Sequence, residues 1–202
     1  LDDGFQSPGL GKDLSLVVID RGYGIGNGRV MPAGPLRAPL AVQLDRASAL
    51  VVVDAGEAAD PSLAPLLADA VRRGLPVLTA RLELEAPDRL AGRRLLAWAG
   101  IGRPAKFAAT LAAAGAEVVE LVAFGDHQRL AAADAEDLLA RAGARGLDLV
   151  TTAKDAARLA GDPAPALLRL ALASRVAAVD LVFDDEAAVT ALLARLARPT
   201  RR

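Results

Sequence analysis

Two adjacent carboxylates near the start of the sequence are suited to metal chemistry. Asp2 and Asp3 follow an apolar residue and precede Gly4. Mg²⁺ binds one or two carboxylates together with phosphate oxygens and water. In P-loop enzymes an Asp at a strand end holds this metal. An Asp-Asp pair taken alone is more often a solvated turn or a helix cap, so both interpretations stay open on the residues alone.

A glycine- and proline-rich segment, residues 20–39, is the second candidate for ligand binding. Glycine occupies every second position from Gly22 to Gly28, which lets the backbone approach a ligand closely. Arg29 and Arg37 could bind phosphate with paired hydrogen bonds. The spacing matches neither the dinucleotide fingerprint nor the phosphate-loop consensus. By spacing alone, a flexible surface loop is an equally good interpretation.

The hexapeptide of residues 100–105, Gly-Ile-Gly-Arg-Pro-Ala, follows an apolar strand and opens a predicted helix. It satisfies a relaxed dinucleotide fingerprint, and Glu120 stands toward the end of the next strand, as a ribose-binding acid would. This pattern makes a nicotinamide-binding domain the main rival hypothesis. Pro104 argues against it, because proline removes one of the N–H groups that would receive a pyrophosphate. A tight turn followed by a capped helix is the alternative.

Two further loops carry residues suited to proton transfer or anion binding. Asp126 and His127, the single histidine, lie in Phe-Gly-Asp-His after a predicted strand. Imidazole titrates near neutral pH, so this step is a candidate acid/base element, although a lone histidine is more often structural. Residues 151–155, Thr-Thr-Ala-Lys-Asp, lie at a strand-to-helix junction. There a hydroxyl would cap the helix and Lys154 could meet an anion.

The elements that must position these residues alternate between strand and helix. The pattern predicts strands at 14–19, 50–53, 76–82, 94–99, 117–123, 147–151 and 175–183, and helices at 62–73, 104–114, 132–142 and 184–197. Strands separated by helices of this length form βαβ units, so we expect an α/β fold with mostly parallel, Rossmann-like sheets and flanking helices. A composition change near residue 45 predicts a domain boundary there.

Composition excludes several classes of function. The 202 residues are 53% hydrophobic and 24% charged, as in a globular protein, and the net charge of −1 gives no general attraction to nucleic acid. The absence of cysteine excludes disulfides, thiolate zinc sites and a cysteine nucleophile, and it fits a reducing cytoplasm. No apolar run reaches the ~20 residues that span a bilayer, so any membrane contact would be peripheral.

The order of the motifs resembles the tetraacyldisaccharide 4'-kinase family. The blocks in question are Leu-Asp-Asp-Gly-Phe-Gln at 1–6, Lys-Asp-Leu at 12–14, Gly-Asn-Gly-Arg-Val-Met-Pro-Ala-Gly-Pro-Leu-Arg at 26–37, Ala-Gly-Ile-Gly-Arg-Pro at 99–104, Phe-x-Asp-His at 124–127 and Thr-Thr-x-Lys-Asp at 151–155. The likeness covers nearly the whole chain, and the first and third blocks are the most specific.

This resemblance implies a two-lobe, P-loop-type kinase with the active site in the cleft between the lobes. The family transfers the γ-phosphate of ATP to the 4'-hydroxyl of a tetraacyldisaccharide 1-phosphate, which makes lipid IVA. By similarity, Asp2 and Asp3 bind Mg²⁺, and with Gln6 they belong to the nucleotide site. His127 and its neighbour Asp126 are expected to be catalytic, with an upstream aspartate as the histidine's partner, and Arg37 lies near the site.

The resemblance also sets expectations for organisation and location. Residues 1–45 would be the remnant of the nucleotide-binding lobe and linker, 46–180 the C-terminal lobe and 181–202 a final helix. The phosphate-binding loop is expected upstream of residue 1, so we expect no kinase activity from these residues alone. The expected location is the cytoplasmic face of the bacterial inner membrane, as a peripheral monomer that binds its lipid disaccharide and no nucleic acid.

Three residues depart from the family pattern. Ala38 and Ala153 stand where glutamates are expected, and Leu130 stands where an aromatic residue is usual. Loss of two carboxylates near the site leaves open a non-catalytic, degenerate relative of the kinases as an alternative to the enzyme.

Overall fold

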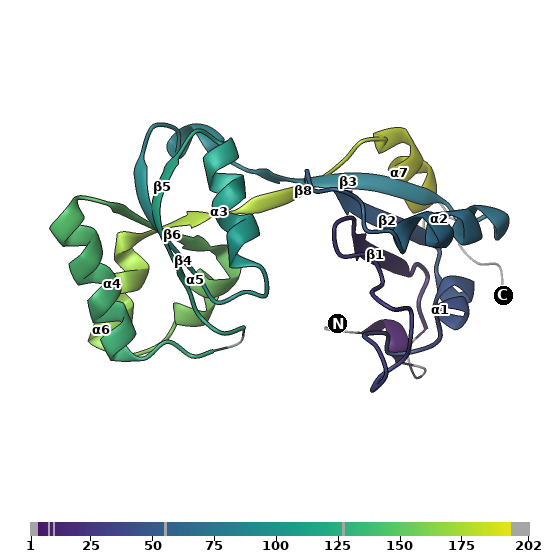
Figure 1. Cartoon of the computed structure of the whole chain (residues 1–202), viewed down its shortest axis with the longest axis horizontal. Helices are drawn as coiled ribbons and strands as arrows, with labels where there is room; N and C mark the ends of the chain where they lie inside the picture. Colours follow the sequence, from purple (N-terminus) through teal and green to yellow (C-terminus); the bar gives the residue numbers. More distant parts are fainter. Residues whose placement is uncertain (1–3, 8, 10, 55, 127, 195–202) are drawn as a thin grey trace. The chain divides into compact units, whose positions relative to one another are not determined.

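The computed structural model describes residues 4–7, 9, 11–54, 56–126 and 128–194, and these form two compact units (Figure 1). Unit 1 is Leu1–Leu82 with Leu181–Arg202, and unit 2 is Glu83–Asp180. Within the described residues, each unit contains one four-stranded sheet with helices packed on it. The predicted α/β class with parallel sheets is confirmed.

Unit 1 is built on a sheet with the strand order β1-β2-β3-β8. The strands are β1 (Leu16–Asp20), β2 (Ala49–Asp54), β3 (Val77–Leu84) and β8 (Val179–Phe183). The first three pair in parallel, with Ile19 opposite Val52 and Leu50 opposite Val77. Parallel neighbours need crossover connections, which helices α1 (Leu40–Arg46) and α2 (Leu63–Arg72) provide.

Helices cover both faces of the sheet in unit 1. On one face, α1 and α2 contribute Leu44 and Leu66 to a cluster that includes Leu50 and Val52 of the central strand. On the other face, helix α7 (Glu186–Leu193) contributes Leu192 to a cluster with the remaining β2 side chains. Strand β2 is therefore a continuous apolar run, as expected for a parallel strand covered on both faces.

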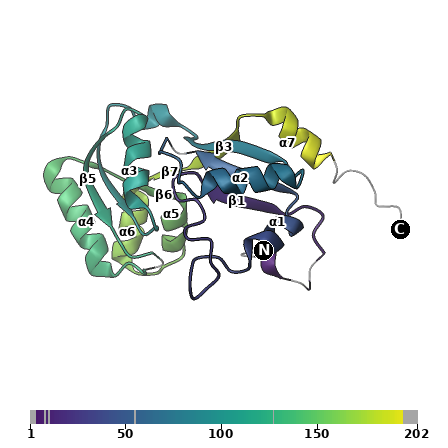
Figure 2. The same ribbon diagram turned by 45° about the vertical axis from the view of Figure 1, so that its right-hand side comes forward.

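Unit 2 has a second sheet with the strand order β5-β4-β6-β7, in which all pairs are parallel. Its strands are β4 (Arg94–Ala99), β5 (Glu117–Ala123), β6 (Asp148–Thr152) and β7 (Ser174–Ala177), and its helices are α3 (Pro104–Ala113), α4 (Ala132–Arg145), α5 (Ala153–Leu159) and α6 (Pro165–Ala173). Figures 1 and 2 show α3 on one side of this sheet and α4 and α6 on the other.

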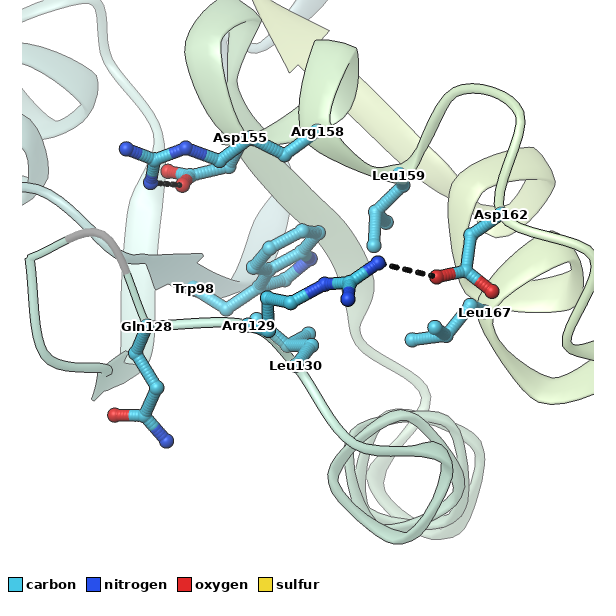
Figure 3. Close-up of a pocket in the computed structure, with 9 residues that line it drawn as sticks. All are labelled: Trp98, Gln128, Arg129, Leu130, Asp155, Arg158, Leu159, Asp162 and Leu167. Atoms are coloured by element: carbon cyan, nitrogen blue, oxygen red, sulfur yellow. Dashed lines mark hydrogen bonds and ion pairs between the residues drawn. The ribbon is translucent and has the colours of Figure 1, made fainter.

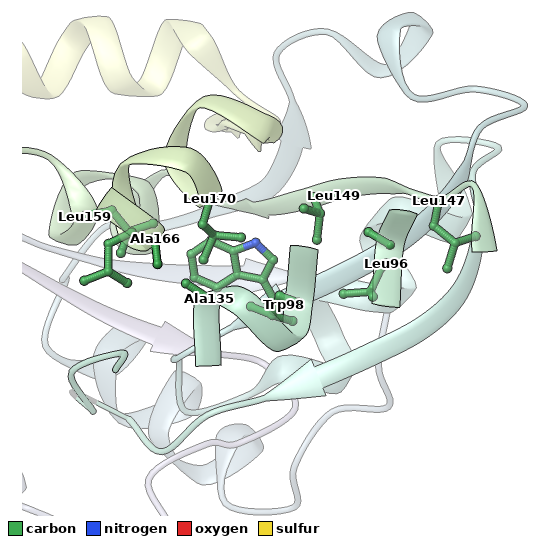
Figure 4. Close-up of a cluster of buried hydrophobic side chains, with 11 residues drawn as sticks. Leu96, Trp98, Ala135, Leu147, Leu149, Leu159, Ala166 and Leu170 are labelled. Carbon is green, nitrogen blue, oxygen red and sulfur yellow. The ribbon is translucent and has the colours of Figure 1, made fainter. Parts of the chain in front are cut away.

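The larger core of unit 2 surrounds the single tryptophan. Trp98 is fully buried on the face of the sheet that α4, α5 and α6 cover, among side chains that include Leu96 and Leu170 (Figure 4). Its indole N–H donates a hydrogen bond to the Ser174 hydroxyl at 3.0 Å, and Phe124 meets its ring edge to face at 6.5 Å. The buried indole thus has a partner for its one polar group.

Most predicted elements are present, and the exceptions have local causes. The predicted strand at 175–183 is wrong as a single element, because the chain leaves the sheet of unit 2 after Ala177 and enters that of unit 1 at Val179. The Ala178 carbonyl accepts a hydrogen bond from the Glu85 N–H at 3.1 Å, and the Asp184 N–H donates to the Thr79 carbonyl at 3.0 Å. Helices α1 and α6 were not predicted, and of α5 only the start, at the junction of residues 151–155, was expected.

The compact units differ from the predicted division near residue 45. That position lies inside unit 1, because β1 and β2 on either side of it are paired in parallel along the whole of β1. The chain passes from unit 1 to unit 2 after Leu82 and returns after Asp180. The assignment of residues 1–45 to a nucleotide-binding lobe stays a prediction. Among the helices of the described residues, none has the length and apolar character to cross a bilayer.

Candidate functional site

Three of the sequence motifs meet at the carboxyl edge of the sheet in unit 2. Gly100 follows β4, Gly125 follows β5, and Thr152 is the last residue of β6. After β4 the chain enters α3 on one face, and after β6 it enters α5 on the other, as the separate clusters of Phe107 and Leu159 show. Neighbouring strands whose connections leave toward opposite faces form a crevice, which is where open α/β sheets bind ligands.

An ion pair with a buried carboxylate fixes the turn that follows β4. Asp155, only 3% exposed, accepts hydrogen bonds from the Gly100 N–H at 3.1 Å, the Thr152 hydroxyl at 2.7 Å and an Arg158 Nη1–H at 3.0 Å. The same Arg158 nitrogen donates to the Gly100 carbonyl at 2.8 Å. Both backbone polar groups of Gly100 are therefore bonded to one pair of side chains. A buried carboxylate needs such compensation, since burial without partners is costly.

Gly100 is also in close contact with the loop that follows β5. A Cβ at this position would lie 3.2 Å from Asp155 Oδ1 and 3.5 Å from the Gly125 carbonyl oxygen. Gly125 is held in turn by Gln128. The side-chain Oε1 of Gln128 accepts from the Gly125 N–H at 2.8 Å, and the backbone N–H of Gln128 donates to the Gly125 carbonyl at 3.0 Å. A side chain at position 100 would therefore crowd the Asp155 carboxylate, while the Gly125 carbonyl lies at an ordinary contact distance.

Asp126, a predicted catalytic residue, lies in this loop and forms an ion pair with Lys154. The Nζ atom lies 3.5 Å from Oδ1, and both side chains are about half exposed. An ion pair with this exposure contributes about 0–1 kcal/mol, so it orients Asp126 without holding it rigidly. The two motifs that carry these residues are thus brought together, although β4 lies between the strands that precede them. His127 lies outside the described residues.

The residues around Gly100 do not have the arrangement of a dinucleotide site. Glu120 lies in the middle of β5, where Arg141 and Arg145 of α4 form ion pairs with it. The Gly100 N–H is already bonded to Asp155, and Pro104 is the first residue of α3. The hexapeptide is therefore a tight turn before a helix. Thr152 caps α5 by accepting from the Asp155 N–H at 3.1 Å, which confirms the capping interpretation.

A cavity of about 190 Å³ lies beside this edge of the sheet (Figure 3). Its lining consists of Trp98, Gln128, Arg129, Leu130, Asp155, Arg158, Leu159, Asp162 and Leu167. The Asp155–Arg158 pair forms part of its wall, and Arg129 forms a second ion pair with Asp162 at 4.0 Å. Leu130, which replaces the expected aromatic residue, packs on the cluster around Trp98. The cavity therefore combines an apolar base with charged walls.

The glycine-rich segment of unit 1 is held by its own hydrogen bonds. The Leu36 N–H donates to the Arg29 carbonyl at 3.1 Å and the Met31 N–H to the Leu36 carbonyl at 2.8 Å, while the Asn27 side chain donates to the Ala33 carbonyl at 2.8 Å. These contacts argue against the flexible-loop interpretation.

The same segment is attached to helix α2 through Ser62. The Ile25 N–H donates to the Ser62 hydroxyl oxygen at 3.0 Å, and this hydroxyl donates to Asp60 Oδ1 at 2.5 Å. The Ser62 N–H donates to the same carboxylate oxygen at 2.8 Å. These hydrogen bonds, the one from the hydroxyl first, lower the pKa of Asp60, because they stabilise its ionised form.

The other predicted site residues lie in unit 1 or outside the described residues. Arg37 is exposed, three residues before α1, and Gln6 belongs to a short 3₁₀ helix, Gly4–Gln6. Asp126 belongs to unit 2, so the predicted residues are divided between the units. Asp2 and Asp3 lie outside the described residues. Within the part of the chain that is described, no group of three or more His, Cys, Asp or Glu side chains could hold a metal ion.

Comparison with known proteins decides the family. The family model described as tetraacyldisaccharide-1-P 4'-kinase, LpxK, matches residues 1–197. The chain belongs to this family. It is 46% identical over 198 residues to the tetraacyldisaccharide 4'-kinase of Rhodospirillum rubrum, covering 97% of this chain and 56% of that protein. It is 50% identical over 194 residues to the Rhodopseudomonas palustris BisB5 protein of the same name, covering 93% and 54%.

A solved structure has the same fold. The crystal structure of LpxK from Aquifex aeolicus in complex with ATP matches with a TM-score of 0.57 and 24% identity, covering 97% of this chain and 56% of that chain. The chain thus spans about half the length of the relatives it matches.

Sequence reasoning did not identify the Asp155–Arg158 pair as part of the site. The Thr-x-x-Asp spacing of Thr152 and Asp155 predicts a helix cap, and that part is confirmed. The contact with Gly100 joins residues 55 positions apart and leaves no local signal in the sequence.

Proposed function

We propose that this chain forms part of an ATP-dependent kinase that phosphorylates the 4'-hydroxyl of a tetraacyldisaccharide 1-phosphate to give lipid IVA in lipid A biosynthesis. The family match over residues 1–197 is the observation that carries the proposal. The relatives that bear this enzyme's name are about twice as long as the chain, so the activity belongs to a protein that includes the rest of their length.

The geometry of unit 2 supports a role in positioning groups for phosphoryl transfer. In this reaction the protein contributes mainly placement and neutralisation of charge. Asp126 is exposed and oriented by Lys154 at the carboxyl edge of the sheet, where ligands bind in folds of this class. His127, next to it in sequence, is proposed to accept the proton of the attacking hydroxyl, and Arg37 to bind anionic groups of the substrate.

ATP and Mg²⁺ are the proposed cofactors. The Aquifex aeolicus relative was crystallised with ATP, and its likeness to this chain is one of fold. Asp2 and Asp3, with Gln6 nearby, are proposed to hold Mg²⁺, since adjacent carboxylates supply the oxygen ligands that this ion prefers. The bound ion would neutralise charge on the phosphates.

The remaining proposals concern the surroundings of the enzyme. An acylated disaccharide is membrane-bound, so the protein is proposed to work at the cytoplasmic face of the bacterial inner membrane through peripheral contact, as a monomer. A net charge of −1 provides no general attraction to nucleic acid, and none is proposed as a partner.

A chimeric enzyme tests the proposal. The N-terminal part of the Rhodospirillum rubrum relative would be joined to this chain at the first aligned residue, and transfer of labelled γ-phosphate from ATP to the lipid disaccharide would be measured. We expect an active chimera, and no activity from the chain alone. The intact Rhodospirillum rubrum protein is the positive control, and Asp126→Asn in the chimera should lower the rate.

A folded but inactive chimera would reject the proposal and favour the degenerate relative. Replacement of Ala38 and Ala153 by glutamate, the residues that the family pattern leads us to expect, would then show whether these two departures account for the loss.

A further inference from the structure

The Asp155–Arg158 pair connects the loops at the carboxyl edge of unit 2, although neither residue belongs to the predicted catalytic set. We infer that these two side chains are positioning residues for the proposed phosphoryl transfer, and that they set the location of Asp126. The inference rests on the proposed function for its meaning in catalysis. The contacts on which it depends lie entirely within unit 2.

The first step leads from Asp155 to the β5–α4 loop through Gly100. Asp155 and Arg158 together bond the N–H and the carbonyl of Gly100, at 3.1 and 2.8 Å. The residue before Gly100 is bonded to the residue before Gly125, because the Phe124 N–H donates to the Ala99 carbonyl at 2.9 Å. Asp126 follows Gly125. A shift of the Gly100 turn therefore moves the backbone from which Asp126 extends.

The second step leads from Asp155 to Asp126 through helix α5. Asp155 accepts from the Thr152 hydroxyl, and Thr152 caps the first turn of the helix, which also contains Lys154. Lys154 then pairs with Asp126 at 3.5 Å. Because that pair is half exposed and weak, the two backbones that carry its partners determine the geometry more than the attraction does. Asp155 belongs to the backbone that carries Lys154, and it reaches the backbone that carries Asp126 through Gly100.

An aspartate is required at position 155 by the donors around it. The N–H of Gly100, the hydroxyl of Thr152 and the guanidinium of Arg158 all donate to its two oxygens. Asparagine has the same shape, but one oxygen is replaced by an NH₂ group that cannot accept. In Asp155→Asn the new NH₂ group would therefore face one of these hydrogen-bond donors, and the repulsion would displace the Gly100 turn. Asp126 and Lys154 would stay chemically intact.

The expected catalytic effect is a loss of rate without a loss of substrate binding. Asp155 is 3% exposed and its oxygens accept hydrogen bonds from protein groups, so we expect it to position other residues and not to bind substrate. Misplacement of a reacting group by about 1 Å costs up to about 100-fold in rate. In the chimera described above, we expect Asp155→Asn to lower kcat by about 10- to 100-fold and to change KM for ATP and for the lipid by less than about threefold.

Glu120→Gln is the matched control. Glu120 is a partly buried carboxylate of the same unit, 20% exposed at its side chain, and it also receives arginine partners. It lies in the middle of β5 and not at the Gly100 turn. We expect this variant to keep the kcat of the parent chimera. The assays would be run at a temperature where Trp98 fluorescence shows that every variant is folded. This choice distinguishes a loss of geometry from a loss of stability.

A second measurement needs no kinase activity. In ¹⁵N-labelled chain, Asp155→Asn should shift the amide signals of Gly100, Gly125 and Asp126, and Glu120→Gln should leave them in place. Unchanged signals at Gly125 and Asp126 would overturn the inference, and so would a kcat for Asp155→Asn equal to that of Glu120→Gln. An inactive parent chimera with these shifts present would reject the proposed function while leaving the coupling of Asp155 to the loop in place.

Discussion

Leu170 offers the sharpest test of how unit 2 is stabilised. Its side chain is fully buried in the cluster around Trp98, while Leu172, two residues later on the same helix, is 89% exposed. Replacement of each leucine by alanine removes the same atoms from the same helix. The difference between the two variants therefore isolates burial, because the change in helix propensity is the same in both.

The magnitude for Leu170→Ala follows from what the substitution removes. Loss of buried apolar groups costs about 0.8 kcal/mol for each methylene-sized group, and a residual cavity adds to this. Because Leu170 is packed among side chains from the sheet and from two other helices, we expect little collapse of the cavity and a cost of about 3–4 kcal/mol, within the range for buried leucines. Leu172→Ala should change stability by less than about 0.5 kcal/mol.

The single tryptophan makes the assay specific to unit 2. Trp98 lies in the affected cluster, so its fluorescence during urea unfolding reports on this unit and not on unit 1. With a urea dependence of about 2 kcal/mol per molar, Leu170→Ala should lower the midpoint by about 1.5–2 M. Leu172→Ala should leave it within about 0.3 M of the parent.

Equal shifts of the two midpoints would refute this account of the core. That result would mean that Leu170 does not pack against Trp98, or that the α6 helix is turned so that both leucines have similar surroundings. A change of slope in Leu170→Ala would point instead to loss of two-state unfolding in unit 2.

Two further predictions concern unit 1. Gly34 lies against the Arg29 carbonyl in the loop at residues 29–36, so the methyl group of Gly34→Ala should push the two sides of this loop apart. We expect the free energy of unfolding to fall by about 1–3 kcal/mol. Faster exchange of the Leu36 amide proton would support this prediction, and an unchanged rate would contradict it. Ser62→Ala should raise the pKa of Asp60 toward the ordinary value of 3.8, which a carboxyl NMR titration measures. Since the pKa of Asp60 is lowered in the folded chain, its contribution to stability is present above about pH 4 and is lost as the pH falls through the lowered value. In Ser62→Ala the pKa difference between folded and unfolded chain is smaller, so this contribution should be smaller at every pH.

Strands were the most predictable part of this fold. Strands β4 and β5 have the predicted bounds, because each is rich in apolar residues and is followed within two residues by a glycine. Helices α1 and α5 have only seven residues, about two turns, which is too short for a helical period to be visible. The break at Ala178 was missed because apolar residues continue across it, and only the different sheet partners on either side mark the change.

The candidate site was predictable in its parts but not in its connections. The positions of residues 100–105, 124–127 and 151–155 after successive strands implied that these loops meet at one edge of a parallel sheet, and within unit 2 they do. The burial of Asp155 and its bonds to Gly100 depend on the order of strands in the sheet, which sequence periodicity does not specify. A short motif therefore predicts a cap more readily than a contact between distant loops.

The insertion of unit 2 between β3 and β8 has a consequence for synthesis of the protein. All of Glu83–Asp180 leaves the ribosome before β8 is complete and before α7 exists, so unit 2 can fold as an uninterrupted segment while the sheet of unit 1 still lacks its last strand. Until Leu192 arrives, the face of β2 that carries Val51 and Val53 is uncovered in the nascent chain. Unit 1, although it begins before unit 2, is therefore completed after it, and β3 has no partner on its β8 side until then.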